Sequence, residues 1–257
     1  MKINKRIQTE CLLNNIVYQD FQAMLFPLNV VQSCFLMPRF SIINNFITPD
    51  NHVSFYIQSI IGCTVLTLSH VVRFLYYYDG SGTGVIRFLL CFDLIFYFVM
   101  SIITYIVNSF QRNFVVELII ILQHVLDFLK TDKQEFLYKH KIQNWLCVLL
   151  VVSIYVFLWL ENCVVGFHIL KLLVNFIGIV PPMIFDMQVV YVTRSVVIIK
   201  DELIAWIHKM EEYKNLHIRP EEEVLRCAVL EYDMFHTYTD IIKAFHLSNK
   251  VYKFLVS

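Results

Sequence analysis

Residues 85–110 read VIRFLLCFDLIFYFVMSIITYIVNSF, an apolar stretch interrupted by one base, Arg87, and one carboxylate, Asp93. A helix of about 20 residues crosses the hydrocarbon core of a bilayer, so this stretch is long enough to span it with some tilt. Three further stretches share this character: residues 53–78, 145–170 and 172–199. The sequence therefore predicts an all-α, polytopic membrane protein, a bundle of four transmembrane helices with long cytosolic helical extensions.

The composition agrees with this class. Hydrophobic residues make up 58% of the chain and charged residues 16%, against about 45–50% and 25% in soluble domains. Glycine and proline number only 6 each, which favours long helices over a β-barrel of short strands. Lys+Arg and Asp+Glu both total 21, so no basic excess points to nucleic acid. The seven cysteines are scattered without a CxxC pair, and we expect no metal site, disulfide framework or cofactor.

The distribution of bases predicts the orientation. The loop DGSGTG at residues 79–84 has no Lys or Arg, whereas bases gather in residues 1–52, in the connector 111–144 and in residues 200–257. The positive-inside rule places these three segments in the cytosol, and with them the N-terminus. A cytosolic helix is expected to begin at Pro220, since a proline followed by Glu221, Glu222 and Glu223 is typical of a first helical turn.

One stretch leaves this topology open. Residues 114–129 are apolar but carry four polar side chains within about a third of the helix circumference. These are Glu117, Gln123, His124 and Asp127. The pattern indicates either an amphipathic helix lying on or below the membrane or an extension of the second span into the cytosol. A spanning helix here would invert everything after it.

No pattern of catalytic residues is present. The chain has no HExxH or GxSxG motif, and the glycine-rich run at 80–84 lacks the Lys-Ser/Thr of a phosphate loop, so it is interpreted as a turn. We therefore expect no catalytic residues and no enzyme.

Ionisable residues at bilayer depth are the candidate ligand site. They cost at least ~2.5 kcal/mol on insertion scales and usually face the bundle interior or a wet cavity. Asp93 follows Arg87 by six residues, and Asp186 follows the pair Pro181-Pro182, which should kink the helix and open space beside it. The predicted ligand-binding residues are Asp93, Tyr97, Trp159, Glu161, Asn162 and Asp186. The alternative is that they form polar bridges between helices, the commoner fate of such residues. Arg73 and Arg194 lie close enough to the span ends to snorkel.

The N-terminal segment carries a family resemblance. Residues 26–32 (FPLNVVQ) and 38–49 (PRFSIINNFITP) resemble the region before the first span of insect gustatory receptors, moth and butterfly members in particular. The layout is similar too, with a tiny first external loop and a long cytosolic connector. The resemblance implies a ligand-gated cation channel subunit of the plasma membrane. It also implies a small-molecule tastant as ligand, the lipid bilayer as surroundings, and a homo- or hetero-tetramer if the chain is complete.

The departures from that family shape the remaining expectations. Family members have seven spans and a C-terminal Thr-Tyr-x-x-x-x-x-Gln-Phe signature, which this sequence lacks. We therefore expect a chain truncated before the fifth transmembrane helix that does not conduct alone. The alternatives are a fragment of an insect odorant receptor and a four-span adaptor or structural protein. A small membrane enzyme or transporter would need clustered catalytic residues or internal repeats, and neither is present.

Overall fold

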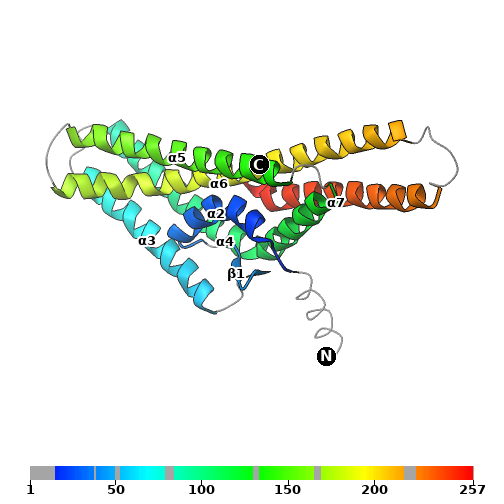
Figure 1. The fold of residues 1–257 in the computed structure, drawn as a ribbon. Coiled ribbons are helices and arrows are strands. Elements are labelled where there is room, and N and C mark those ends of the chain that lie inside the picture. The colour runs from blue at the N-terminus through cyan, green and yellow to red at the C-terminus, as the bar shows by residue number, and fades with distance from the viewer. Residues whose placement is uncertain are drawn as a thin grey trace, which may run out of the picture.

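A computed structural model of the chain describes residues 15–37, 39–49, 53–78, 84–129, 133–164, 169–216 and 224–256. Of these residues, 91% are helical, which confirms the all-α prediction. The elements in chain order are α2 (Gln19–Cys34), β1 (Ser41–Ile43), β2 (Phe46–Thr48), α3 (Val53–Tyr78), α4 (Gly84–Leu129), α5 (Lys133–Val164), α6 (Ile169–Leu216) and α7 (Val224–Val256) (Figure 1). The predicted helix start at Pro220 and most of the 79–84 loop lie outside the described residues.

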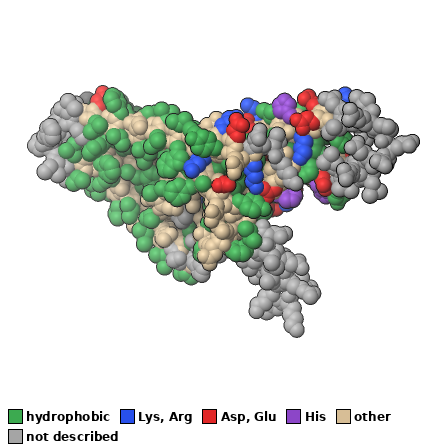
Figure 2. Space-filling model, in the orientation of Figure 1, with side chains coloured by type: hydrophobic (Ala, Val, Ile, Leu, Met, Phe, Trp, Pro, Cys, Tyr) green, Lys and Arg blue, Asp and Glu red, His purple; other side chains and the backbone are tan. Residues whose placement is uncertain are grey.

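Among the described residues, four helices are long and apolar enough to cross a membrane, namely α3, α4, α5 and α6. This confirms the predicted count of long apolar helices, and such helices are those of a membrane-embedded protein. Figure 2 shows hydrophobic side chains over most of the left half of the molecule, whereas charged and histidine side chains gather over the right half. We call the part built by α3, residues 84–110, residues 145–164 and residues 169–199 the apolar half, and the remainder the charged half. Only the apolar half has a surface suited to lipid.

Helices α4 and α6 are much longer than a bilayer requires. They contain 46 and 48 residues, or about 70 Å each at 1.5 Å per residue, against a hydrocarbon core of about 30 Å. Residues 114–129 continue α4 without interruption. Of the arrangements that the sequence left open, the structure therefore shows the one in which the second apolar stretch is extended. Helices α6 and α7 then lie side by side in the charged half (Figure 1).

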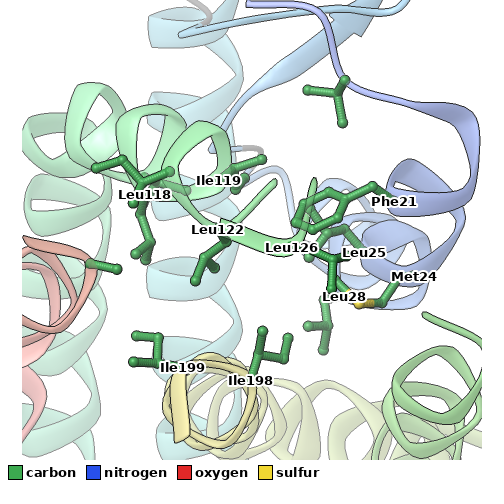
Figure 3. Packing of buried hydrophobic residues seen from close by; sticks show 14 of the residues in the cluster. Phe21, Met24, Leu25, Leu28, Leu118, Ile119, Leu122, Leu126, Ile198 and Ile199 are labelled. Carbon is green, nitrogen blue, oxygen red and sulfur yellow. The ribbon is translucent and has the colours of Figure 1, made fainter. Parts of the chain in front are cut away.

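The N-terminal segment is part of the core. Helix α2 packs on α5, and β1 and β2 form an antiparallel hairpin whose two-residue turn has positive φ at Asn44 and Asn45, 52° and 68°. Asparagine is one of the few residues that adopt this backbone region readily. Side chains of α2 converge with α4 and α6 in one cluster (Figure 3). The labelled members are Phe21, Met24, Leu25, Leu28, Leu118, Ile119, Leu122, Leu126, Ile198 and Ile199. This packing holds α2 and the hairpin against α4, α5 and α6.

Candidate functional site

A cavity of about 270 Å³ lies in the apolar half between α3, α4, α5 and α6. One residue of the N-terminal segment, Met37, forms part of its wall. The described lining residues are Met37, Leu66, Phe96, Tyr97, Met100, Ser101, Thr104, Tyr155, Pro181, Pro182, Ile184, Phe185 and Asp186. Two of the predicted ligand-binding residues, Tyr97 and Asp186, are among them. The proline pair lines the cavity as well, at the place where the sequence predicts space beside α6.

One hydrogen bond joins two walls of the cavity. The Tyr155 hydroxyl of α5 donates to Asp186 Oδ2 of α6 at 2.7 Å. Asp186 is exposed, and it is the one charged side chain among the described lining residues. Thr104 donates its hydroxyl to the Met100 carbonyl at 2.7 Å, so part of the hydrogen-bonding capacity of the wall is used within α4. The polar chemistry of the cavity is therefore concentrated at Asp186.

Asp93 belongs to an ion pair beside the cavity. Arg73 Nη1 of α3 lies 3.3 Å from Asp93 Oδ2 of α4. The Arg73 side chain therefore makes contacts with neighbouring helices, which the sequence alone does not predict. Arg87, which precedes Asp93 in the sequence, lies over the Tyr78 ring at 5.2 Å from its centroid.

The same guanidinium uses a backbone acceptor created by the proline pair. Pro182 has no N–H, so it does not donate to the carbonyl of Gly178 one turn earlier. Arg73 Nη1 lies 3.5 Å from that carbonyl. A Cβ on residue 178 would lie 2.7 Å from Arg73 Cδ, so a larger residue there would force the arginine side chain to shift. Arg73 thus joins α3, α4 and α6.

An aromatic stack lies close to this ion pair and to the cavity. His70 is buried and stacks on Tyr97, with ring centroids 5.3 Å apart and ring planes 8° apart. Tyr97 follows Asp93 by one helical turn on α4 and lines the cavity. Asp93 is therefore near the cavity without being part of its described lining.

The other predicted site residues lie elsewhere. Trp159 Nε1 donates to the Leu172 carbonyl at 3.3 Å, and its ring packs edge-on against Phe176 at 5.8 Å. Glu161 is exposed near the end of α5. Neither residue lines the cavity, and both belong to the region where α5 and α6 meet. Asn162 lies in α5, and its side chain is outside the described part of the structure.

A buried polar cluster that contacts the cavity wall through Met37 has no counterpart among the predicted site residues. Arg39, only 1% exposed, donates from Nε to Asn108 Oδ1 at 3.1 Å and from Nη2 to Gln188 Oε1. Its guanidinium carbon also lies 4.4 Å from the centroid of the Tyr191 ring. Asn108 Nδ2 in turn donates to the Met37 sulfur at 3.4 Å. Because Met37 lines the cavity, this cluster connects the cavity to the N-terminal segment.

A second buried polar cluster lies where the apolar half meets the charged half. Arg194 donates from Nε to Asn144 Oδ1 at 2.7 Å and from Nη2 to Gln143 Oε1 at 2.9 Å. Its Nη2 is also 2.9 Å from His140 Nδ1. Arg194 is 6% exposed, so its interpretation as a snorkelling residue is wrong: the polar partners on α5 hold it inside the protein.

His140 in this cluster is a neutral acceptor. Burial, and then the positive charge of Arg194, lower the pKa of His140 from its ordinary 6.5 to about 4. With Nδ1 accepting from Arg194, the proton is on Nε2, which lies 3.4 Å from Asp201 Oδ2. His140 of α5 thus contacts α6 at Arg194, in the apolar half, and at Asp201, in the charged half.

The chemistry of the described residues does not include a metal centre. No group of three or more His, Cys, Asp or Glu side chains with metal-binding geometry occurs among them. Comparison with known proteins found no matching family model, no matching curated protein and no matching solved structure. The functional argument therefore depends on the cavity and the clusters around it.

Proposed function

We propose that the chain is a chemosensory receptor subunit, part of a ligand-gated cation channel of the insect gustatory receptor type, and that its small-molecule tastant binds in the cavity. The observation that carries this proposal is the cavity itself. It lies between four apolar helices and contains the Tyr155–Asp186 hydrogen bond. A carboxylate at this depth opposes membrane insertion by at least ~2.5 kcal/mol, which favours a functional role for it.

The composition of the wall is that of a ligand site. Small-molecule pockets are mostly apolar and aromatic, with a few polar groups that fix orientation. The lining follows this pattern, with Phe96, Phe185 and two tyrosines around one carboxylate. Its volume of about 270 Å³ is close to the lower end of ligand pockets, about 300 Å³, so the proposed tastant is small.

A contiguous set of contacts leads from the cavity to the charged half. Met37 lines the cavity and accepts from Asn108, which accepts from Arg39. A ligand that displaces Met37 would change the contacts that hold the N-terminal hairpin against α4. In the proposed receptor this is the route by which occupancy is communicated to the cytosolic side. The orientation with a cytosolic N-terminus, the plasma-membrane location and assembly into a tetramer belong to the same proposal.

Binding to the purified chain in lipid nanodiscs tests the proposal. A panel of sugars, amines, alcohols and carboxylates is measured by calorimetry against the wild type and Ser101→Phe, which fills the cavity. Ile103→Phe is the matched control, because Ile103 is 40% exposed on the outer face of α4. Binding that Ser101→Phe abolishes and Ile103→Phe preserves supports the proposal. Binding that survives Ser101→Phe, or no binding by any member of the panel, contradicts it.

A second candidate function has its own observation. Helix α7 is not among the helices apolar enough to span, yet it exposes Tyr232, Phe235, Tyr238 and Phe245 by 40–67%. Such a stripe suits a four-span adaptor that binds a protein partner through its cytosolic helices. In an adaptor, Phe235→Ser abolishes partner binding and Asp186→Asn leaves it unchanged; in the receptor, Asp186→Asn changes ligand binding.

A further inference from the structure

We infer that the cavity takes an organic cation, a small protonated amine or quaternary ammonium ion with an apolar body. The inference rests on the proposed function, since it names the chemical class of the ligand for the same cavity. Three properties of the wall support it: its charge, its aromatic rings and its shortage of other hydrogen-bonding groups.

The charge comes from Asp186. Tyr155 donates one neutral hydrogen bond to Oδ2, which orients the carboxylate without cancelling its charge. A carboxylate accepts several hydrogen bonds through its two oxygens, so capacity remains for a charged donor from a ligand. The nearby base, Arg73, pairs with Asp93 and is not among the described lining residues. An anionic ligand would therefore meet repulsion in this cavity, and a cation would meet attraction.

The rings favour a cation over other hydrogen-bond donors. Phe96, Tyr97, Tyr155 and Phe185 line the cavity together with the sulfur atoms of Met37 and Met100. The faces of aromatic rings carry negative potential and attract ammonium groups. A carboxylate surrounded by aromatic rings is the arrangement that recognises alkylammonium ions without requiring many hydrogen bonds.

The same wall disfavours a polyol. A sugar buries several hydroxyl groups, each of which needs a partner when it leaves water. Apart from the Asp186 carboxylate, the polar side chains of the described lining are the hydroxyl groups of Ser101, Thr104, Tyr97 and Tyr155. The hydroxyl groups of Thr104 and Tyr155 already donate hydrogen bonds within the protein. An amine with one charged head and an apolar body leaves few groups unsatisfied. Since a cavity of about 150 Å³ holds benzene, 270 Å³ holds a ring with a short aminoalkyl chain.

A matched pair of probes tests the inference on the chain in nanodiscs. 2-Phenylethylamine carries a positive charge at pH 7, and 2-phenylethanol replaces the amine with a neutral hydroxyl at nearly the same size. We expect the amine to bind the wild type at least about tenfold more tightly than the alcohol. Asp186→Asn should remove this preference, whereas Glu161→Gln, which neutralises an exposed carboxylate outside the cavity, should keep it.

Two further variants keep the outcome decisive. Phe96→Leu retains every charge and should weaken binding of the amine several-fold while leaving binding of the alcohol nearly unchanged. It therefore replaces Asp186→Asn as the test if that variant does not fold. Ser101→Phe should abolish binding of both probes. Equal binding of the two probes, tighter binding of the alcohol, or a preference that survives Asp186→Asn overturns the cationic ligand and leaves the cavity as a binding site. No binding by these probes or by the wider panel overturns the proposed function as well.

Discussion

Arg73 and Asp93 form an ion pair at 3.3 Å that joins α3 to α4 within the apolar half of the protein. Both side chains are about one-third exposed on the isolated chain, 33% for Arg73 and 38% for Asp93. In a bilayer the surface around them faces hydrocarbon or a neighbouring helix, where an unpaired charge is costly. The pairing lets two ionised residues stay in a segment that otherwise matches lipid.

Removing one member of this pair should be worse than removing both. We expect Arg73→Met and Asp93→Asn each to lower the free energy of unfolding by about 2 kcal/mol, because each leaves one charge uncompensated among apolar helices. The double variant should recover much of this loss. Unfolding of the four proteins in mixed micelles gives the coupling energy directly. Strictly additive losses would show that the pair makes no such contribution.

The length of the apolar stretches was enough to predict the helical class and the four long helices. Residues 85–110 alone meet the requirement for a span, and α4 contains them all. The sequence could not predict which helices exchange polar contacts, because that depends on how α3, α4 and α6 are rotated against one another. Arg73 therefore looked like a residue free to reach the membrane surface, whereas its partners lie 20 and 105 positions away in the chain.

The candidate site was predictable only in part, because the sequence shows which polar residues lie in apolar stretches but not which of them converge. Tyr97 and Asp186 lie in apolar stretches, where polar side chains tend to turn inward, and both line the cavity. Glu161 and Trp159 are close to the end of α5, where a side chain has other partners, and neither reaches it. Nothing in the sequence predicted Met37 as a lining residue, because its place in the wall results from how the N-terminal segment packs against the bundle.

Arg39 should hold the N-terminal segment in place. Replacing it with methionine removes the donors to Asn108 and Gln188, whose side-chain oxygens then stay buried without those bonds. We expect a loss of about 2–4 kcal/mol and faster proteolysis within residues 39–49, with little rescue by Arg39→Lys because the two donors diverge in a planar fork. Limited proteolysis followed by mass spectrometry measures this. Lys200→Met, at an exposed base, is the control. Equal cleavage rates in Arg39→Met and the control would contradict the anchoring role.

His140 should make the protein sensitive to mild acid. Its pKa is about 4 in the fold and about 6.5 in the unfolded chain, so the unfolded chain takes up the proton first as pH falls. The stability contributed by neutral His140 is complete above pH 6.5 and is lost progressively toward pH 4, by about 3 kcal/mol in total. Thermal unfolding across this range should show a flatter profile for His140→Gln, which keeps an acceptor for Arg194. His208→Gln, at an exposed histidine, should retain the wild-type slope.

Glu202 should act in the opposite direction. It is fully buried one turn beyond Ile198 and Ile199, and neither of its carboxylate oxygens has a hydrogen-bond partner in the structure. Burial raises the pKa of Glu202 well above its ordinary 4.5, so the folded protein keeps a proton that the unfolded chain releases. The stability of the wild type therefore falls as pH rises above 4.5, because only the unfolded state gains from ionisation.

Glu202→Gln removes this titration while preserving size. The variant and the wild type should unfold at similar temperatures near pH 4.5, and the variant should become progressively more stable than the wild type between pH 5 and pH 8. Melting curves of both proteins in one detergent, in steps across this range, measure the divergence. Glu212→Gln, at an exposed carboxylate on the same helix, should follow the wild type throughout. Parallel pH profiles for Glu202→Gln and the wild type would mean that Glu202 is ionised in the folded protein, which would require a cationic or hydrogen-bonding partner for its carboxylate.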